Sequence, residues 1–193
     1  METHFVFTSF KGLIESAEYL LEHTEDNDAH FNSNKYSFIL VAAASLESLL
    51  NEGIISWAFH LFPKGDHKRH ATAFLSMNLG KKLDALGFLL SSGKFITDNE
   101  SEIYQTFVSL IKLRNEVAHS KDFYKEAEIE LSKINEDGGR DFTLPYDLTK
   151  LVNNHPLSIK QDKCLFIIDS LKHLEAVLNN DIEHSKTDLF KPL

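Results

Sequence analysis

Three side chains able to act on a phosphate group lie within six residues of one another. Arg114 and Asn115 are adjacent, and His119 follows four residues after Asn115. A guanidinium can hold phosphate oxygens with bidentate geometry, and an imidazole can move a proton near neutral pH. On an α-helix, Asn115 and His119 share one edge, whereas Arg114 lies about 140° from His119. Arg114 and His119 therefore converge only if the helix end bends or a second subunit contributes.

Arg114 occupies the apolar face of the helix predicted over residues 99–119. Four apolar residues form a stripe about 80° wide on that helix: Ile103, Phe107, Leu110 and Val117. Arg114 lies near the centre of this stripe, where a charge costs free energy unless an acid or a polar cavity receives it. A compensating group from elsewhere in the fold is therefore expected beside Arg114.

The spacing of apolar residues predicts that helices position these side chains. The predicted helices cover residues 9–23, 35–62, 79–90, 99–119 and 154–181. Pro63 and Gly65 end the second helix, so residues 63–70 are predicted to form a connecting segment. Thr97 and Glu100 match the capping-box pattern, which predicts that the fourth helix starts there.

The composition indicates one helical domain over residues 1–193. The chain has 8 Gly and 4 Pro, and this scarcity of turn-forming residues argues against a fold of many short strands. The single cysteine, Cys164, excludes an internal disulfide and a multi-cysteine metal site, and its apolar neighbours predict a buried structural thiol. Residues 121–155 form an unassigned excursion, in which 121–135 extend the fourth helix or form another and 141–155 are irregular. We predict an all-α, antiparallel helical bundle.

Charge is unevenly distributed along the chain. The formal net charge is −9, the wrong sign for a protein that grips nucleic acid through its overall charge. One stretch is nevertheless basic, and its five cations are Lys64, Lys68, Arg69, Lys81 and Lys82. We predict that these residues form a basic rim that an RNA backbone can approach. The alternative is a loop that carries charge only for solvation.

Arg114, Asn115 and His119 resemble the signature of a known family. Residues 114–119 read RNEVAH, which resembles the R-x4-6-H signature of HEPN domains, usually with Asn after the Arg. The stretch ASLESLLNE at 44–52 is similar to the helix that precedes the signature in many HEPN proteins and often supplies an acidic residue. The order of a long helix, a shorter Lys-containing helix and the signature helix also resembles the family. The resemblance covers about residues 35–120.

The resemblance implies a HEPN-like bundle and metal-independent RNA cleavage, with 2′,3′-cyclic phosphate ends. Arg114 would hold the phosphate oxygens, His119 would move the proton, and Asn115 would orient the imidazole or a phosphate oxygen. Glu47, or Asn51 one turn further on, would receive Arg114 or fix the tautomer of His119. Two other interpretations stay open: a purely structural Arg114–Glu47 ion pair, and Glu47 and Asn51 as ordinary surface residues. Neither a metal nor a cofactor is expected. Because one signature supplies one histidine, the resemblance implies a homodimer with a composite site. Toxins of the family are often paired with a nucleotidyltransferase-type antitoxin, so a toxin or defence component with a cognate antitoxin is a further expectation.

Two other classes of function stay open. The first is a non-catalytic HEPN module that binds nucleotide or RNA, or serves for dimerisation, and the net charge of −9 favours it. The second is a helical adaptor without a nucleic-acid role. The N-terminus METHFVFTSFKG lacks the basic and apolar regions of a signal peptide, and the longest apolar run is too short to span a bilayer. We therefore expect a cytoplasmic protein that does not enter a membrane.

Overall fold

The fold is mainly helical in a computed structural model. The model describes residues 9–24, 33–63, 65–119, 137–140, 145–153, 156–180 and 188–193, together with Leu131, Ile134, Phe142 and Thr143. These described residues form seven α-helices: α1 (Phe10–Glu22), α2 (Ser33–Leu61), α3 (His67–Leu75), α4 (Leu79–Leu90), α5 (Glu102–Ala118), α6 (Tyr146–Asn153) and α7 (Gln161–Asn179). They also form a short 3-10 helix (Pro156–Ser158) and two short strands, β1 (Phe95–Thr97) and β2 (Phe190–Pro192). The predicted all-α character is therefore confirmed.

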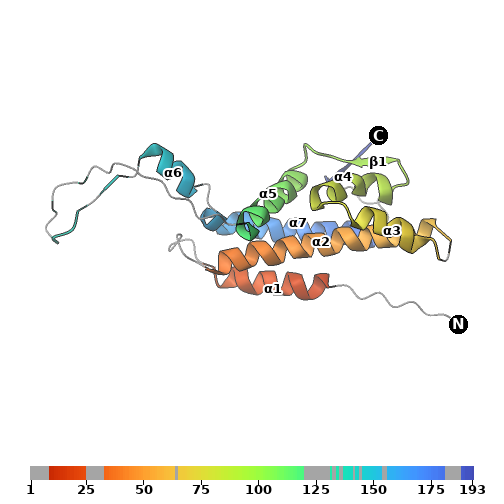
Figure 1. Ribbon diagram of the computed structural model, residues 1–193, viewed down its shortest axis with the longest axis horizontal. Coiled ribbons are helices and arrows are strands. Elements are labelled where there is room, and N and C mark those ends of the chain that lie inside the picture. Colours follow the sequence, from red (N-terminus) through yellow and green to blue (C-terminus); the bar gives the residue numbers. More distant parts are fainter. Residues whose placement is uncertain are drawn as a thin grey trace.

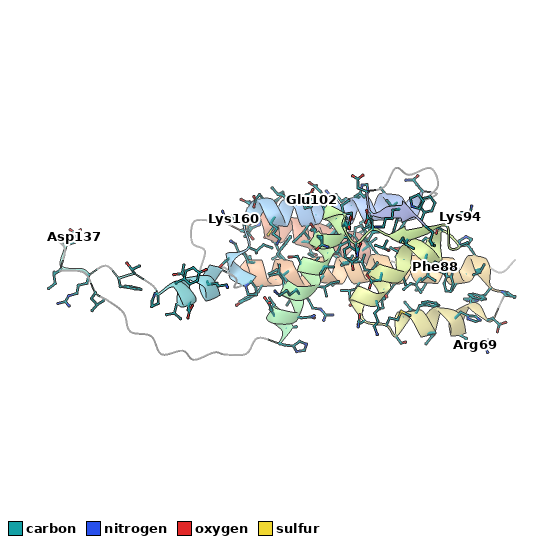
Figure 2. All side chains as sticks on the ribbon, turned by 90° about the horizontal axis from the view of Figure 1, so that it is seen from above. Arg69, Phe88, Lys94, Glu102, Asp137 and Lys160 are labelled. Carbon is teal, nitrogen blue, oxygen red and sulfur yellow. The ribbon has the colours of Figure 1, made fainter. Side chains whose placement is uncertain are left out.

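The long helices lie side by side, and a shorter one crosses them. α1, α2 and α7 pack against one another with their axes roughly aligned, while α6 lies away from this group (Figure 1). α5 runs steeply across α2 and α7, as the view from above shows (Figure 2). The predicted bundle thus describes the aligned helices, but the helix that carries residues 114–118 crosses them rather than extending along them.

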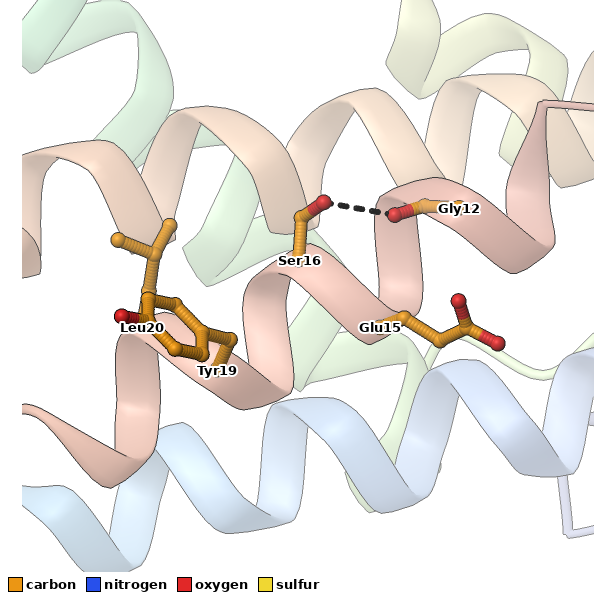
Figure 3. A pocket seen from close by; sticks show the side chains of 5 residues that line it. All are labelled: Gly12, Glu15, Ser16, Tyr19 and Leu20. Carbon is orange, nitrogen blue, oxygen red and sulfur yellow. Dashed lines mark hydrogen bonds between the residues drawn. The ribbon is translucent and has the colours of Figure 1, made fainter.

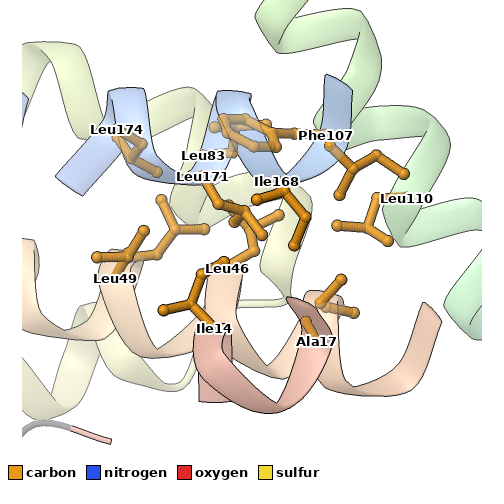
Figure 4. Close-up of a cluster of buried hydrophobic side chains, with 14 of the residues drawn as sticks. Ile14, Ala17, Leu46, Leu49, Leu83, Phe107, Leu110, Ile168, Leu171 and Leu174 are labelled. Carbon is orange, nitrogen blue, oxygen red and sulfur yellow. The ribbon is translucent and has the colours of Figure 1, made fainter. Parts of the chain in front are cut away.

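α2 lies at the centre of the hydrophobic core. Its fully buried apolar residues are Phe38, Ile39, Ala42, Leu46, Leu49, Leu50, Ile54 and Ala58. Side chains of α1, α4, α5 and α7 meet this face, among them Ala17, Leu83, Phe107 and Leu171 (Figure 4). Each fully buried Leu, Ile or Phe contributes about 1.5–3 kcal/mol relative to an exposed position. Residues 34–61 are also long and apolar enough to cross a membrane. A helix that is buried in a protein core can have the same length and composition.

The predicted helices over 9–23, 35–62 and 79–90 agree with α1, α2 and α4. The predicted start of the signature helix is wrong, because Thr97 belongs to β1 and donates its hydroxyl hydrogen to Leu83 O at 2.9 Å. Ser101 caps α5 instead, and its hydroxyl oxygen accepts the N–H of Tyr104 at 3.1 Å. Cys164 is buried, as predicted.

Three other boundaries differ from the sequence predictions. α3 begins inside the predicted connecting segment, and α6 falls in residues that were predicted to be irregular. The last long helix starts at Gln161 rather than near 154, because a 3-10 turn precedes it. Most of 121–135 lies outside the described residues, so the prediction for that segment is not addressed by the structure.

The two strands form a small antiparallel sheet that closes over α4. Phe95 pairs with Pro192 and Thr97 with Phe190. The sheet lies so close to α4 that Gly87 has no room for a side chain. A Cβ atom at Gly87 would lie 2.7 Å from the backbone carbon of Ile96 and 2.7 Å from the backbone nitrogen of Thr97. Gly87 therefore permits the close contact between helix and strand.

We expect Gly87→Ala to lower the free energy of unfolding by about 1–3 kcal/mol, because backbone atoms of β1 would have to move. The matched control is Gly12→Ala on α1, where a Cβ meets nothing within 4 Å. The control should raise the free energy of unfolding by about 0.5–1 kcal/mol through higher helix propensity. Urea unfolding of the two variants measures both effects, and equal stabilities would contradict the close packing at Gly87.

Candidate functional site

Contacts in the first half of α5 hold the signature residues in position. The Tyr104 hydroxyl donates a hydrogen bond to Asp84 Oδ1 of α4 at 2.7 Å. This bond to a carboxylate, together with partial burial, raises the pKa of Tyr104. One turn later, Phe107 is completely buried in the core. α5 is thereby fixed against α4 and α2, and its last turn lies beside the middle of α2.

Arg114 lies in that last turn and contacts α2. Its Nη1 donates a hydrogen bond to Asn115 Oδ1 at 3.0 Å, and its Nη2 lies 3.8 Å from Glu47 Oε2. Glu47 is therefore beside Arg114, as the sequence analysis expected. The pair is not deeply buried, since the side chains of Arg114 and Glu47 are 36% and 41% exposed. Solvent screens a pair of this kind, and the guanidinium remains accessible from outside.

Lys82 reaches the same carboxylate from α4. Its Nζ donates to Asn51 Oδ1 at 2.8 Å and lies 3.5 Å from Glu47 Oε1. The whole residue is only 3% exposed. The prediction that Lys82 belongs to an exposed basic rim is therefore wrong. A buried ammonium needs a carboxylate and a hydrogen-bond acceptor, and Glu47 and Asn51 supply them.

Asn51 was the alternative partner for Arg114, and the structure assigns it to Lys82 instead. The two residues of α2 are four positions apart and therefore face the same way. This face meets α4 at Asn51 and both α4 and α5 at Glu47. The interpretation of these two side chains as ordinary surface polar residues is wrong for that reason.

His119 terminates α5. It is the C-cap residue, its side chain is exposed, and its backbone N–H donates to Asn115 O at 3.0 Å. Asn115 uses its side-chain oxygen for Arg114, so it orients the guanidinium rather than the imidazole.

Three of the other predicted basic residues lie on two helices. Lys68 and Arg69 are exposed on α3, and Lys81 is exposed at the start of α4, while Lys64 lies outside the described residues. Arg69 projects from the outer side of α3 (Figure 2). Aromatic packing holds α3 on α2: the ring of His70 stacks on that of Phe62, with centroids 3.7 Å apart. Three of the five predicted cations are therefore exposed, two on α3 and one at the start of α4.

Two surface pockets lie elsewhere on the molecule. One, of about 450 Å³, is a shallow depression on α1 lined by Gly12, Glu15, Ser16, Tyr19 and Leu20 (Figure 3). A smaller one of about 150 Å³ lies between α1, α2 and α7. Neither pocket includes Arg114 or His119. The side chain of Arg114 is 36% exposed, and His119 is exposed as well.

The burial of Lys82 was not predicted, although the spacing of apolar residues in α4 indicates it. The apolar stripe of α4 contains Leu79, Leu83 and Leu86, and Lys82 follows Leu79 by three positions and precedes Leu86 by four. These spacings put Lys82 on the buried face of the helix. The neighbouring Lys81 falls outside the stripe and is exposed.

Comparison of this chain with protein-family models, curated proteins and solved structures finds no match in any of the three.

We expect Glu47→Gln to lower the free energy of unfolding by about 1–2 kcal/mol, because the buried ammonium of Lys82 loses its counter-charge but keeps Asn51. Urea unfolding at neutral pH measures this effect.

Glu116→Gln provides the matched control. Glu116 has a side chain exposed to the same extent, but its partner is the exposed Lys112, 3.9 Å away on the same helix. The control should change the free energy of unfolding by less than about 0.5 kcal/mol. Equal effects of the two substitutions would contradict a buried charge network at Glu47.

Proposed function

We propose that this chain is a metal-independent endoribonuclease of the HEPN type. The observation that carries the proposal is the partly exposed guanidinium of Arg114, which Asn115 and Glu47 hold near the C-terminal end of α5, five residues before His119. An oriented guanidinium suits the non-bridging oxygens of a phosphodiester, where negative charge increases during cleavage. The RNEVAH signature, in a helical fold, gives the same assignment by resemblance.

The proposed reaction is attack of a ribose 2′-hydroxyl on the adjacent phosphorus. A base takes the proton of the 2′-hydroxyl, and the new O–P bond closes a 2′,3′-cyclic phosphate. The bond from phosphorus to the 5′-oxygen breaks, and an acid gives that oxygen a proton. His119 can serve as base or acid, because an imidazole exchanges protons near neutral pH. Arg114 stabilises the charge on the non-bridging oxygens throughout.

The two proton transfers point to a homodimer. One chain supplies a single His119, which is exposed at the C-terminal end of α5. If two copies pair with their α5 ends facing each other, the two histidines can act on opposite sides of one phosphate. A toxin or defence role with a cognate antitoxin remains part of the proposal through the family resemblance alone.

We expect His119→Ala to reduce cleavage of a mixed RNA pool in EDTA by at least about 100-fold, because general acid–base catalysis is lost. His23→Ala is the control: His23 is an exposed histidine on α1 whose Nδ1 pairs with Tyr19 O at 2.7 Å. The control should cleave like the unmodified protein. Sequencing of cyclic-phosphate ends measures the reaction, and equal cleavage by both variants would reject His119 as the catalytic group.

Mixing the unmodified protein with an equal amount of His119→Ala tests the composite site. If each site needs both histidines, exchange of subunits should lower the activity per unmodified chain to about half. An unchanged activity per unmodified chain would show that one chain is sufficient.

The second candidate is a HEPN module that binds RNA without cleaving it. The Glu47 carboxylate beside Arg114 favours this function over cleavage, because a nearby negative charge opposes the negative charge that develops on the phosphate during cleavage. Binding would then depend mainly on the exposed cations of α3 and α4. This candidate predicts RNA binding by the chain and no cyclic-phosphate product.

We expect RNA affinity to fall steeply with rising salt, and the double variant Lys68→Gln/Arg69→Gln to reduce the slope of log affinity against log salt by about 1.4. Lys11→Gln on α1 removes an exposed cation outside the basic region, so its slope should stay unchanged. Fluorescence anisotropy with a single-stranded RNA measures the slopes. Equal slopes for all proteins would remove α3 from the RNA-binding surface.

A further inference from the structure

The cluster at the middle of α2 contains two cations and one carboxylate. Lys82 and Arg114 each carry a positive charge, and Glu47 is the one carboxylate paired with either of them among the described residues. Asn51 and Asn115 supply neutral oxygen atoms to the two cations. The cluster therefore carries a formal charge of +1 in a protein whose net charge is −9.

The excess charge is located at Arg114. The ammonium of Lys82 is almost completely buried, and a charge in that position is stable only with a counter-ion. Glu47 must serve it, and each of its two oxygen atoms faces one cation, at 3.5 Å for Lys82 and 3.8 Å for Arg114. Arg114 thus shares a carboxylate with a buried residue that cannot reach water for compensation.

The next carboxylate along the helix is engaged elsewhere. Glu116 lies 3.9 Å from Lys112 Nζ, on the exposed side of α5. The guanidinium of Arg114 has five N–H donors, and one of them is used in a hydrogen bond to Asn115. Its charge and its donors can therefore serve an external anion.

We propose that Lys82 sets the charge of the candidate site: by engaging Glu47 from inside the fold, it leaves Arg114 with the uncompensated positive charge that binds a phosphate oxyanion. Lys82 is a positioning residue here and never touches the ligand. The inference rests on the proposed function only for the identity of the ligand as an RNA phosphate. Without Lys82, the Glu47 carboxylate would neutralise Arg114 and the site would reject anions.

The test compares variants that change the charge of the cluster in known steps. Lys82→Met brings its formal charge to zero, and Lys82→Met/Glu47→Gln returns it to +1. The matched control, Lys82→Met/Glu116→Gln, restores the same net charge to the protein by removing a carboxylate of similar exposure that does not contact Arg114. Circular dichroism and urea unfolding select the variants that fold, and Lys82→Leu replaces Lys82→Met if the latter does not.

The probe is a short single-stranded RNA with 2′-O-methyl groups, which binds but cannot be cleaved. We expect Lys82→Met to weaken its binding about tenfold, the effect of one partly screened charge at contact distance. Glu47→Gln should restore the affinity in the Lys82→Met background to within about threefold, while Glu116→Gln should not. Unchanged binding in Lys82→Met, or equal rescue by both glutamines, would overturn the proposal.

A second arm uses inorganic phosphate, detected through the NMR signal of the Arg114 Nε–H group. An effect of Lys82→Met on both probes assigns the site to phosphate in general, and an effect on the RNA alone assigns it to a phosphodiester. An effect on neither rejects it. Because neither arm measures cleavage, the inference stands if the chain binds but does not cut RNA. It fails, with the enzyme intact, if Lys82→Met leaves both binding and cleavage unchanged.

Discussion

Burial of α2 is the constraint on which the other helices depend, because a helix of 29 residues with a continuous apolar face has to be covered by other elements. α1, α3, α4, α5 and α7 all pack against it. Removing water from this apolar surface is the main favourable contribution to folding. The crossing of α5 follows from the same requirement, since Phe107 and Leu110 reach the core from a helix that lies across the others.

Polar residues that face this apolar core must meet one another's requirements for hydrogen bonds and counter-charges. Glu47 and Asn51 follow immediately on buried leucines of α2, and they meet the buried ammonium of Lys82. An ion pair with one buried partner adds little net stability, but removal of the other partner leaves a costly unpaired charge. The network therefore fixes how α4 lies on α2, and it determines which charges are left for the surface. Arg114 is the cation of the network that water and ligands can reach.

At the end of α5, Arg114 and Asn115 are joined by a hydrogen bond, and the side chains of Arg114 and His119 are accessible to solvent. Electrostatic stabilisation is strongest where water is excluded. A second copy of the chain would supply both the enclosure and the second imidazole. This physical need connects the geometry of the single chain with the proposed homodimer.

The sequence by itself determined the all-α character and three of the helices. Apolar periodicity located α1, α2 and α4, because it reflects which face of each helix is buried. Contacts between distant segments were decided only by the tertiary structure. Thr97 has the residue pattern of a helix cap, yet pairing of β1 with β2 places it in a strand. The leucine spacing of α4 distinguishes Lys82 from Lys81, but the partners of Lys82 were decided by the packing of α4 on α2, because Glu47 and Asn51 come from a helix distant in the sequence.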